Sequence, residues 1–287
     1  MADDALASPT VATGLSRRPK PKTYDLKRQP GFATVALLCL AMLYAPIIIL
    51  VIFSFNASRS VTRWSSFSLD WYASVIGNGE IHDATRNSLT IAFVATVIST
   101  VLATAAALAT ARTRPWRGMK AAYMVVNLPL MVPEIVTAVA TLSFFALLAA
   151  QFHLNLGIGN LILAHTVFCI PFAYMPIRAR LEDMDLTLEQ AAADLYAPPW
   201  RVFRRITLPL LMPGISAGAA LALIVSFDDF TITQLVAGPG QTTLPLYIWG
   251  QLHKFGITPE VNAISSILLV VSILLVSLSF AIGSRRK

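Results

Sequence analysis

Residues 189–214 read EQAAADLYAPPWRVFRRITLPLLMPG, a polar and basic stretch that lies between two of the most apolar segments of the chain. An apolar stripe at helical spacing runs through its first part and the residues just before it, formed by Leu186, Leu188, Ala192 and Leu195. Pro198 disfavours helical backbone at the residue before it, and Pro199 suits the first position of a new helix. The pattern therefore predicts two short helices joined by a tight turn, lying on the membrane surface.

The second of these helices has one apolar face and one basic face. Trp200, Phe203 and Ile206 share the apolar face, and arginines at positions 201, 204 and 205 lie opposite. Large aromatic side chains are typical of the centre of a protein interface, and the small residues Ala191–Ala193 let a partner approach the backbone closely. These features favour a docking element for a soluble partner. A basic amphipathic helix that simply rests on lipid is the alternative.

The composition places the chain among membrane proteins. Of its 287 residues, 56% are hydrophobic and 13% are charged, whereas a soluble domain is about 25% charged. A helix needs roughly 20 apolar residues to cross the hydrocarbon core of a bilayer. We predict six transmembrane helices, at residues 32–55, 87–111, 121–150, 158–177, 210–236 and 263–283. The predicted fold class is an all-α integral membrane protein.

The distribution of basic residues indicates how these helices are oriented. With the N-terminus in the cytoplasm, 18 of the 22 lysines and arginines fall on the cytoplasmic side. The remaining four are Arg59, Arg63, Arg86 and Lys254. Because basic segments are retained in the cytoplasm during insertion, we read the net charge of +7 as a topology signal and not as nucleic-acid binding. Residues 1–30 are predicted to be a disordered, basic cytoplasmic tail, and residues 31–287 the transmembrane domain.

The sequence lacks the motifs of a catalytic subunit. No G-x-x-x-x-G-K-[ST] stretch is present to bind nucleotide phosphates, and neither H-E-x-x-H nor a pair of Asp-rich motifs is found. Cys39 and Cys169 both fall inside predicted spans, where a lone cysteine is typical of packing. We therefore predict no catalytic residue, no metal site and no cofactor.

Two outer segments contain aromatic residues suited to the membrane–water interface. In residues 56–86, Trp71, Tyr72 and Val75 share one face of a predicted short helix. Residues 237–262 are punctuated by Gly and Pro and predict a loop with a short central helix. The predicted interfacial aromatic belt consists of Trp64, Trp71, Tyr247 and Trp249. The same surface is compatible with docking of an external binding protein.

Three carboxylates lie well inside the predicted spans. They are Glu134 in the third span and the neighbouring Asp228 and Asp229 in the fifth. A carboxylate is costly in hydrocarbon, and no Lys or Arg falls within the spans to neutralise these groups. The three acids must therefore face a water-filled pathway, a partner or another polar group. Several acids along one pathway suit a cationic substrate such as a polyamine.

Helix-breaking features near these acids provide a structural alternative. Pro129 and Pro133 are expected to break or kink the third span and to expose backbone carbonyls. In this alternative, Asp228 and Asp229 cap broken helix segments instead of contacting a substrate. His165 in the fourth span is expected to be a packed, hydrogen-bonded core residue.

The spacing in the polar stretch resembles the cytoplasmic coupling loop, or EAA loop, of permease subunits in binding-protein-dependent ABC importers. The match runs from Gln190-Ala191-Ala192 through Phe203 and Ile206 to Leu208-Pro209. The resemblance places the coupling loop at about residues 181–209 and makes it the contact with a partner ATPase. The residues implied in that contact are Glu189, Gln190, Ala191, Ala192, Tyr196, Trp200, Phe203, Leu208 and Pro209.

Two residues depart from the usual motif of this loop. Gln190 stands where the motif has Glu, although Glu189 is adjacent, and Tyr196 stands where the motif has Gly. Gly at that position supplies a left-handed turn, which Tyr reaches only at a cost of roughly 1 kcal/mol or more. We expect Pro198 and Pro199 to set the bend in place of a left-handed residue.

The resemblance covers nearly the whole chain from the first span and is closest at residues 226–270, SFDDFTITQLVAGPGQTTLPLYIWGQLHKFGITPEVNAISSILLV. This segment, together with LPLMVPEIVTA at residues 128–138, is similar to the second permease subunit of spermidine/putrescine importers. The resemblance implies a type I ABC importer permease fold with six transmembrane helices and cytoplasmic coupling helices. It also implies the bacterial inner membrane as location, with both termini in the cytoplasm.

The resemblance further implies a set of partners. These are a second permease subunit, a dimer of ABC ATPases and a periplasmic solute-binding protein that delivers putrescine or spermidine. The chain itself is then a non-catalytic subunit embedded in membrane lipid. Three alternatives stay open: the same machinery with another small solute, a proton-coupled secondary transporter that uses Glu134 and Asp228, and an intramembrane enzyme. The secondary transporter leaves the cytoplasmic helix pair unexplained.

Overall fold

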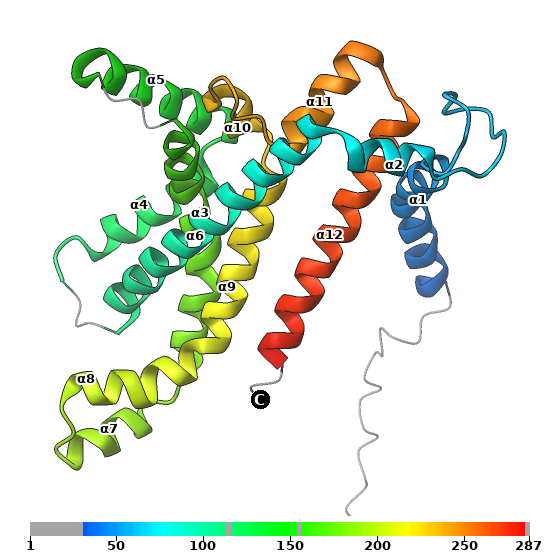
Figure 1. Cartoon of the computed structure of the whole chain (residues 1–287). Helices are drawn as coiled ribbons and strands as arrows, with labels where there is room; N and C mark the ends of the chain where they lie inside the picture. Colours follow the sequence, from blue (N-terminus) through cyan, green and yellow to red (C-terminus); the bar gives the residue numbers. More distant parts are fainter. Residues whose placement is uncertain (1–30, 113–115, 154–156, 285–287) are drawn as a thin grey trace, which may run out of the picture. The chain divides into compact units, whose positions relative to one another are not determined.

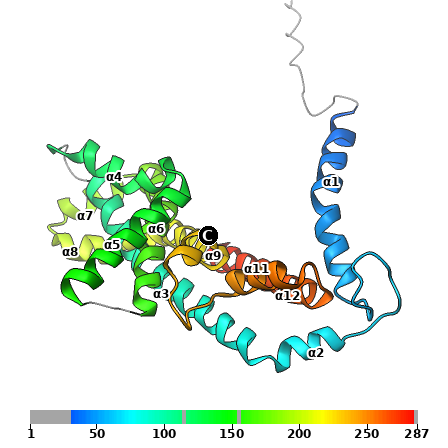
Figure 2. The ribbon, with the colours of Figure 1, turned by 90° about the horizontal axis from the view of Figure 1, so that it is seen from above.

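The structure of the protein is a computed structural model, and it describes residues 31–112, 116–153 and 157–284. The chain divides into two compact units, Met1–Ile47 and Ile48–Lys287. The described part of the first unit is most of helix α1 (Phe32–Phe53), whose described side chains there are exposed. The second unit contains the end of α1 and all the later helices (Figures 1 and 2). The predicted tail at residues 1–30 lies outside the described residues.

Five helices in the described chain are long and apolar enough to cross a membrane. They are α1, α3 (Gly79–Ala111), α5 (Glu134–Phe152), α6 (Ile158–Asp183) and the continuous run Pro199–Asp228. A further long helix, α12 (Pro259–Ser284), contains the shorter apolar stretch Pro259–Leu274. Besides helices, the described residues contain an isolated bridge between Asn56 and Phe67. The predicted all-α membrane class is confirmed.

Short helices connect or interrupt the long ones. They are α2 (Asp70–Gly77), α4 (Met119–Met131), α7 (Thr187–Asp194), α10 (Thr231–Val236) and α11 (Leu244–Phe255). The continuous run consists of α8 (Pro199–Val202), the π-helix η2 (Phe203–Thr207) and α9 (Leu208–Asp228). A π-helical turn is an uncommon interruption that is frequent at functional sites.

The third predicted span is two helices and not one. The span predicted at 121–150 consists of α4, which ends at Met131, and α5, which begins at Glu134. Val132 and Pro133 between them have extended backbone, with ψ angles of 136° and 133°. Proline lacks a backbone N–H and disfavours helix at the residue before it. The expected proline break is therefore present, and it places Glu134 in the first turn of α5.

The fifth predicted span, at residues 210–236, is also broken. Helix α9 ends at Asp228, Asp229 has extended backbone with φ −64° and ψ 130°, and α10 begins at Thr231. The single uninterrupted helix predicted for this segment is therefore wrong. The break opens backbone N–H groups within a segment that the hydropathy pattern reads as continuous, and these groups need acceptors.

Helices α3, α6 and α9 pack together to form the core of the second unit. Gly218 makes the closest approach, because a Cβ atom added there would lie 2.5 Å from the carbonyl oxygen of Ala173 on α6. Small residues at four-residue spacing let membrane helices approach closely, and Gly214 lies one turn earlier against Arg180. Cys169 is buried in this core, as expected for packing, whereas Cys39 is exposed on α1, contrary to expectation.

A smaller cluster lies where α2, the start of α3, α11 and the start of α12 meet. Its buried side chains are Val75, Ile81, Ala84, Leu244, Tyr247, Ala263 and Ile264. Trp71 and Tyr72 pack against the cluster, and the indole N–H of Trp71 donates to the carbonyl of Asn56 at 2.9 Å. The predicted shared face of α2 therefore packs on protein. Trp64 and Trp249 stay exposed.

Candidate functional site

The loop between α6 and α9 contains α7, the first of the two predicted short helices, whereas the second, α8, continues through η2 into α9 as one run from Pro199 to Asp228. Figure 1 shows α7 and α8 lying next to each other at the end of the α8–η2–α9 run. Helix α7 begins where Oδ1 of Asp185 accepts a hydrogen bond from the backbone N–H of Thr187 at 2.9 Å. This backbone hydrogen bond lowers the pKa of the Asp185 carboxyl from its ordinary value.

The turn between α7 and α8 is made by Tyr196 in the left-handed conformation, with φ of 56°. The N–H of Tyr196 donates to the carbonyl of Ala193 at 2.9 Å, and the N–H of Ala197 donates to that of Ala192 at 3.0 Å. The expectation that the double proline replaces a left-handed residue is therefore wrong. These backbone hydrogen bonds terminate α7 in the way a glycine does at a helix end, and they hold Tyr196 in a strained backbone state. Pro199 opens α8 at its first position, as predicted.

Large apolar side chains stand out from this loop into solvent. Tyr196 is 96% exposed and Trp200 is 68% exposed, and Leu195 beside them is also exposed. We call Leu195, Tyr196 and Trp200 the exposed apolar patch. Phe203 is half-buried and stacks on Trp200 with ring centroids 5.7 Å apart. It therefore packs against the patch without belonging to its exposed surface.

The other residues of the predicted coupling set differ in exposure. Gln190, Ala191 and Pro209 are exposed, whereas Ala192 and Leu208 are half-buried. These positions flank the exposed apolar patch in the sequence.

Glu189 differs from its neighbours because it is held by its own subunit. Its Oε1 atom accepts a hydrogen bond from Oγ1 of Thr207 in η2 at 2.8 Å. The same oxygen lies 4.0 Å from Nη2 of Arg112 at the end of α3. Sequence reasoning missed Arg112 and Thr207, because local spacing carries no signal that these residues meet Glu189.

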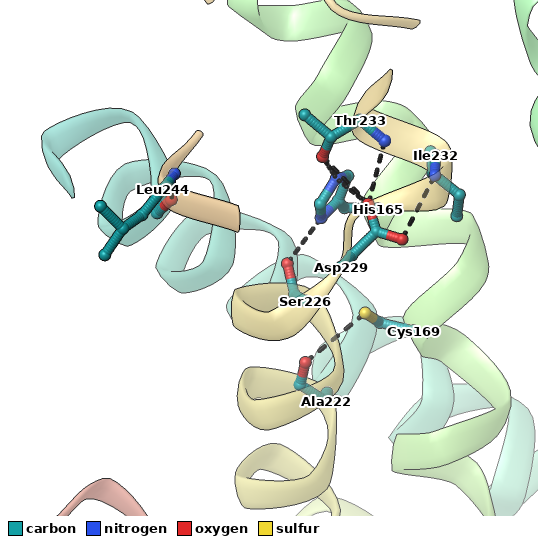
Figure 3. Close-up of polar contacts among 9 residues, drawn as sticks. His165, Cys169, Ala222, Ser226, Asp229, Ile232, Thr233 and Leu244 are labelled. Carbon is teal, nitrogen blue, oxygen red and sulfur yellow. Dashed lines mark hydrogen bonds and ion pairs between the residues drawn. The ribbon is translucent and has the colours of Figure 1, made fainter. Parts of the chain in front are cut away.

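Asp229 is enclosed in a polar network (Figure 3). Its carboxylate accepts hydrogen bonds from the N–H of Ile232 at 3.3 Å and from both the N–H and the hydroxyl of Thr233 at 3.0 Å. Its Oδ2 also lies 3.3 Å from Nε2 of His165. Asp229 thus satisfies backbone N–H groups at the start of α10, which is the capping role of the structural alternative.

His165 is the buried link between three elements, as Figure 3 shows. It lies on α6, its Nδ1 is 2.8 Å from Oγ of Ser226 on α9, and its Nε2 is 3.1 Å from Oγ1 of Thr233 on α10. Its expected role as a packed, hydrogen-bonded core residue is confirmed. The pairing of His165 with Asp229 was not predictable, because the two residues belong to different helical segments and local spacing carries no signal that they meet.

Asp228 and Glu134 have surroundings unlike those of Asp229. Asp228 is exposed in this subunit, and its side chain reaches Ser272 on α12. Glu134 is half-buried and reaches the side chains of Asp229 and Thr231. The structure therefore brings Glu134 to the buried network, while the break after α9 directs the two adjacent aspartates into different environments.

Comparison with known proteins identifies relatives over most of the chain. Residues 99–286 match the family described as binding-protein-dependent transport system inner membrane component. The putrescine transport system permease protein PotI of Escherichia coli (strain K12) is 37% identical over 244 residues, which are 84% of this chain and 86% of that protein. The spermidine/putrescine transport system permease protein PotC of the same strain is 38% identical over 236 residues, covering 82% and 87%.

Solved structures share the fold at lower identity. A bacterial alginate ABC transporter, in complex with its pentasaccharide-bound periplasmic protein, has a chain with a TM-score of 0.66 and 18% identity. That match covers 91% of this chain and 96% of the other. The inward-facing MetNI methionine ABC transporter has a TM-score of 0.60 and 20% identity, covering 71% and 94%. The fold is that of ABC importer permeases.

Proposed function

Because the chain belongs to the family of inner membrane components of binding-protein-dependent transport systems, we propose that it forms half of the membrane pathway of an ATP-driven polyamine importer. The other half is a second permease subunit. The cargo follows from two relatives named for putrescine and for spermidine/putrescine transport, each at least 37% identical over more than four-fifths of the chain. The chain is a permease subunit, and ATP is hydrolysed on a separate ATPase.

The exposed apolar patch is the observation that carries the proposed docking of the ATPase. Large aromatic side chains that stay exposed to water are unfavourable for the stability of an isolated subunit. Apolar side chains of this size are typical anchors of protein interfaces. The loop lies between two membrane-spanning helices and carries arginines on its other face. One ATPase of a dimer binds this loop, and the second binds the corresponding loop of the partner permease.

The proposed orientation places both termini and the α7–α8 loop in the cytoplasm. Helices α2 and α11 then lie on the periplasmic side, where a solute-binding protein delivers the cargo. This orientation follows the excess of Lys and Arg in the cytoplasmic segments, and α7 and α8 fall on the side where ATP is present.

Asp228 and Glu134 are the residues proposed to attract the cargo. Both retain exposure in the isolated subunit, and an ammonium group is attracted by a carboxylate at the edge of a wet pathway. Asp229 is buried and its oxygens are used within the subunit, so its proposed part is to hold the pathway wall in shape.

The proposed function is tested by transport with the complete complex. The chain, its partner permease and the ATPase are reconstituted in vesicles with the binding protein outside and ATP inside. We expect uptake of labelled putrescine or spermidine that depends on ATP and on the binding protein. Uptake driven by a proton gradient without ATP overturns the importer class, and uptake of another solute that polyamines do not inhibit overturns the cargo.

Exchange of Asp228 for asparagine separates charge from shape. We expect Asp228→Asn to lower polyamine uptake at limiting substrate while the partner permease and the ATPase stay bound. Asp83→Asn, at an exposed aspartate of α3 outside the coupling loop, is the matched control and is expected to leave uptake unchanged. Full uptake by Asp228→Asn contradicts a role for its charge.

A further inference from the structure

Helix α7, the nearby η2 and the end of α3, which is far from both in the sequence, meet at Glu189. Glu189 of α7 accepts a hydrogen bond from Thr207 at 2.8 Å, and Thr207 is buried at the end of η2. Arg112 follows α3 and lies 4.0 Å from the same carboxylate oxygen. The side chains of Arg112 and Glu189 are 15% and 22% exposed, so water screens their attraction only in part.

Arg112 depends on Glu189 for electrostatic compensation. Among the residues that the structure describes, the Nε and Nη2 atoms of Arg112 are buried and make no hydrogen bond. A guanidinium buried without a partner is strongly destabilising, and the carboxylate of Glu189 is the charge that the structure places next to it. A shift of about 1 Å would turn this ion pair into a charge-assisted hydrogen bond.

The helices to which Arg112 and Thr207 belong are fastened to each other. The hydroxyls of Thr110 on α3 and Tyr174 on α6 lie 2.7 Å apart. Arg180 on α6 donates through Nε to the carbonyl of Leu210 on α9 at 3.1 Å. With the close approach of Gly218 to α6, these contacts make α3, α6 and α9 one packed block. A side chain that contacts both the end of α3 and η2 is therefore linked to the whole block.

Within one loop, Glu189 thus contacts α3 and η2 of its own subunit, whereas the exposed apolar patch is free to contact a partner. We propose that Glu189 is a positioning residue which fastens α7 to α3 and η2, so that a movement of the docked ATPase is passed to the helical block. The proposal rests on the proposed function, because it requires an ATPase bound at the patch. Without Glu189, α7 is joined to the block through its chain ends and the irregular π-helical turn, and it moves without carrying α3 along.

The test compares transport with ATP hydrolysis in reconstituted complexes carrying Glu189→Ala or Glu189→Gln. A hydrogen bond to a charged group is worth enough to shift an equilibrium by at least about tenfold. We therefore expect Glu189→Ala to retain bound ATPase and ATP hydrolysis while solute imported per ATP falls about tenfold. In Glu189→Gln the side-chain amide oxygen can still accept the hydrogen bond from Thr207, so we expect a smaller fall in solute imported per ATP. Ser143→Ala is the control, since the Ser143 hydroxyl donates to the carbonyl of Val139 within α5 at 2.9 Å, outside the coupling loop.

Rescue by charge exchange distinguishes fastening from mere folding. Combining Arg112→Glu with Glu189→Arg is expected to restore import per ATP above that of either single variant. Unchanged import per ATP in Glu189→Ala overturns the proposal, and so does loss of bound ATPase, which makes Glu189 a docking residue. If Glu189→Ala fails to fold, solute imported per ATP is compared between Glu189→Gln and wild type, and equal values overturn the proposal. A wild-type complex that binds no ATPase rejects the proposed function itself, which is a separate result.

Discussion

Replacement of Trp200 by alanine tests the exposed apolar patch directly. A tryptophan buries up to about 250 Å², and Trp200 is 68% exposed, so a partner can cover about 170 Å² of it. At about 25 cal/mol per Å² this area gives an upper limit of about 4 kcal/mol. Central aromatic residues of interfaces contribute about 2 kcal/mol or more. We therefore expect Trp200→Ala to weaken ATPase binding by about 30-fold or more.

The same substitution is expected to change the stability of the subunit little. Within the chain, Trp200 stacks on Phe203 with centroids 5.7 Å apart, a contact worth about 0.5–1.5 kcal/mol beyond its buried area. That loss is confined to a peripheral loop. Weaker ATPase binding without a matching loss of thermal stability is therefore the expected signature of docking.

ATPase binding is measured by titrating purified ATPase onto the detergent-solubilised permease pair. Trp64→Ala is the matched control, because Trp64 is also exposed, at 48%, and packs edge-on against Phe53 at 6.1 Å. Trp64 belongs to the proposed periplasmic side, so its variant is expected to bind the ATPase normally. Equal affinities for wild type and Trp200→Ala refute the docking assignment.

Three further pairs of substitutions test other contacts. Tyr196→Gly is expected to keep the turn between α7 and α8 as resistant to proteolysis as wild type, whereas Tyr196→Val, with a branched residue at positive φ, is expected to expose the loop to proteolysis; equal cleavage of the two variants contradicts the strained turn. Asp229→Ala is expected to lose subunit assembly, which Asp229→Asn retains in part because an acceptor remains for the N–H groups of α10; assembly of both to wild-type levels rules out capping. Gly218→Ala is expected to lower the unfolding temperature through overpacking against Ala173, at about 1–3 kcal/mol, while Gly250→Ala, which meets open space, does not.

Much of the fold was predictable because it rests on local patterns. Apolar runs of sufficient length place the membrane helices, and Pro133 and Pro199 mark a break and a helix start where the structure has them. The end of α9 at Asp228 was not predicted, because the apolar sequence continues across the break into α10. The conformation of Tyr196 was also misjudged, since the hydrogen bonds that end α7 outweigh the cost of a left-handed residue.

The candidate site divides in the same way between local and distant information. The patch residues could be identified from spacing, because they lie on one short helical loop. The partners of the acids could not be identified from spacing. His165 reaches Asp229 from another helix, and Arg112 reaches Glu189 from the end of α3. Neither pair leaves a periodic signal in the sequence.

The sequence by itself determined that this chain is a helical membrane protein with a basic, helical loop carrying aromatic residues, because hydrophobic length and proline position act within a few residues. The tertiary structure decided which acids are enclosed and which remain exposed. Asp228 and Asp229 are neighbours in the chain, but the end of α9 falls between them and turns one toward α12 and the other toward His165. The close packing of α9 on α6 at Gly218 brings the helices near enough for such contacts to form.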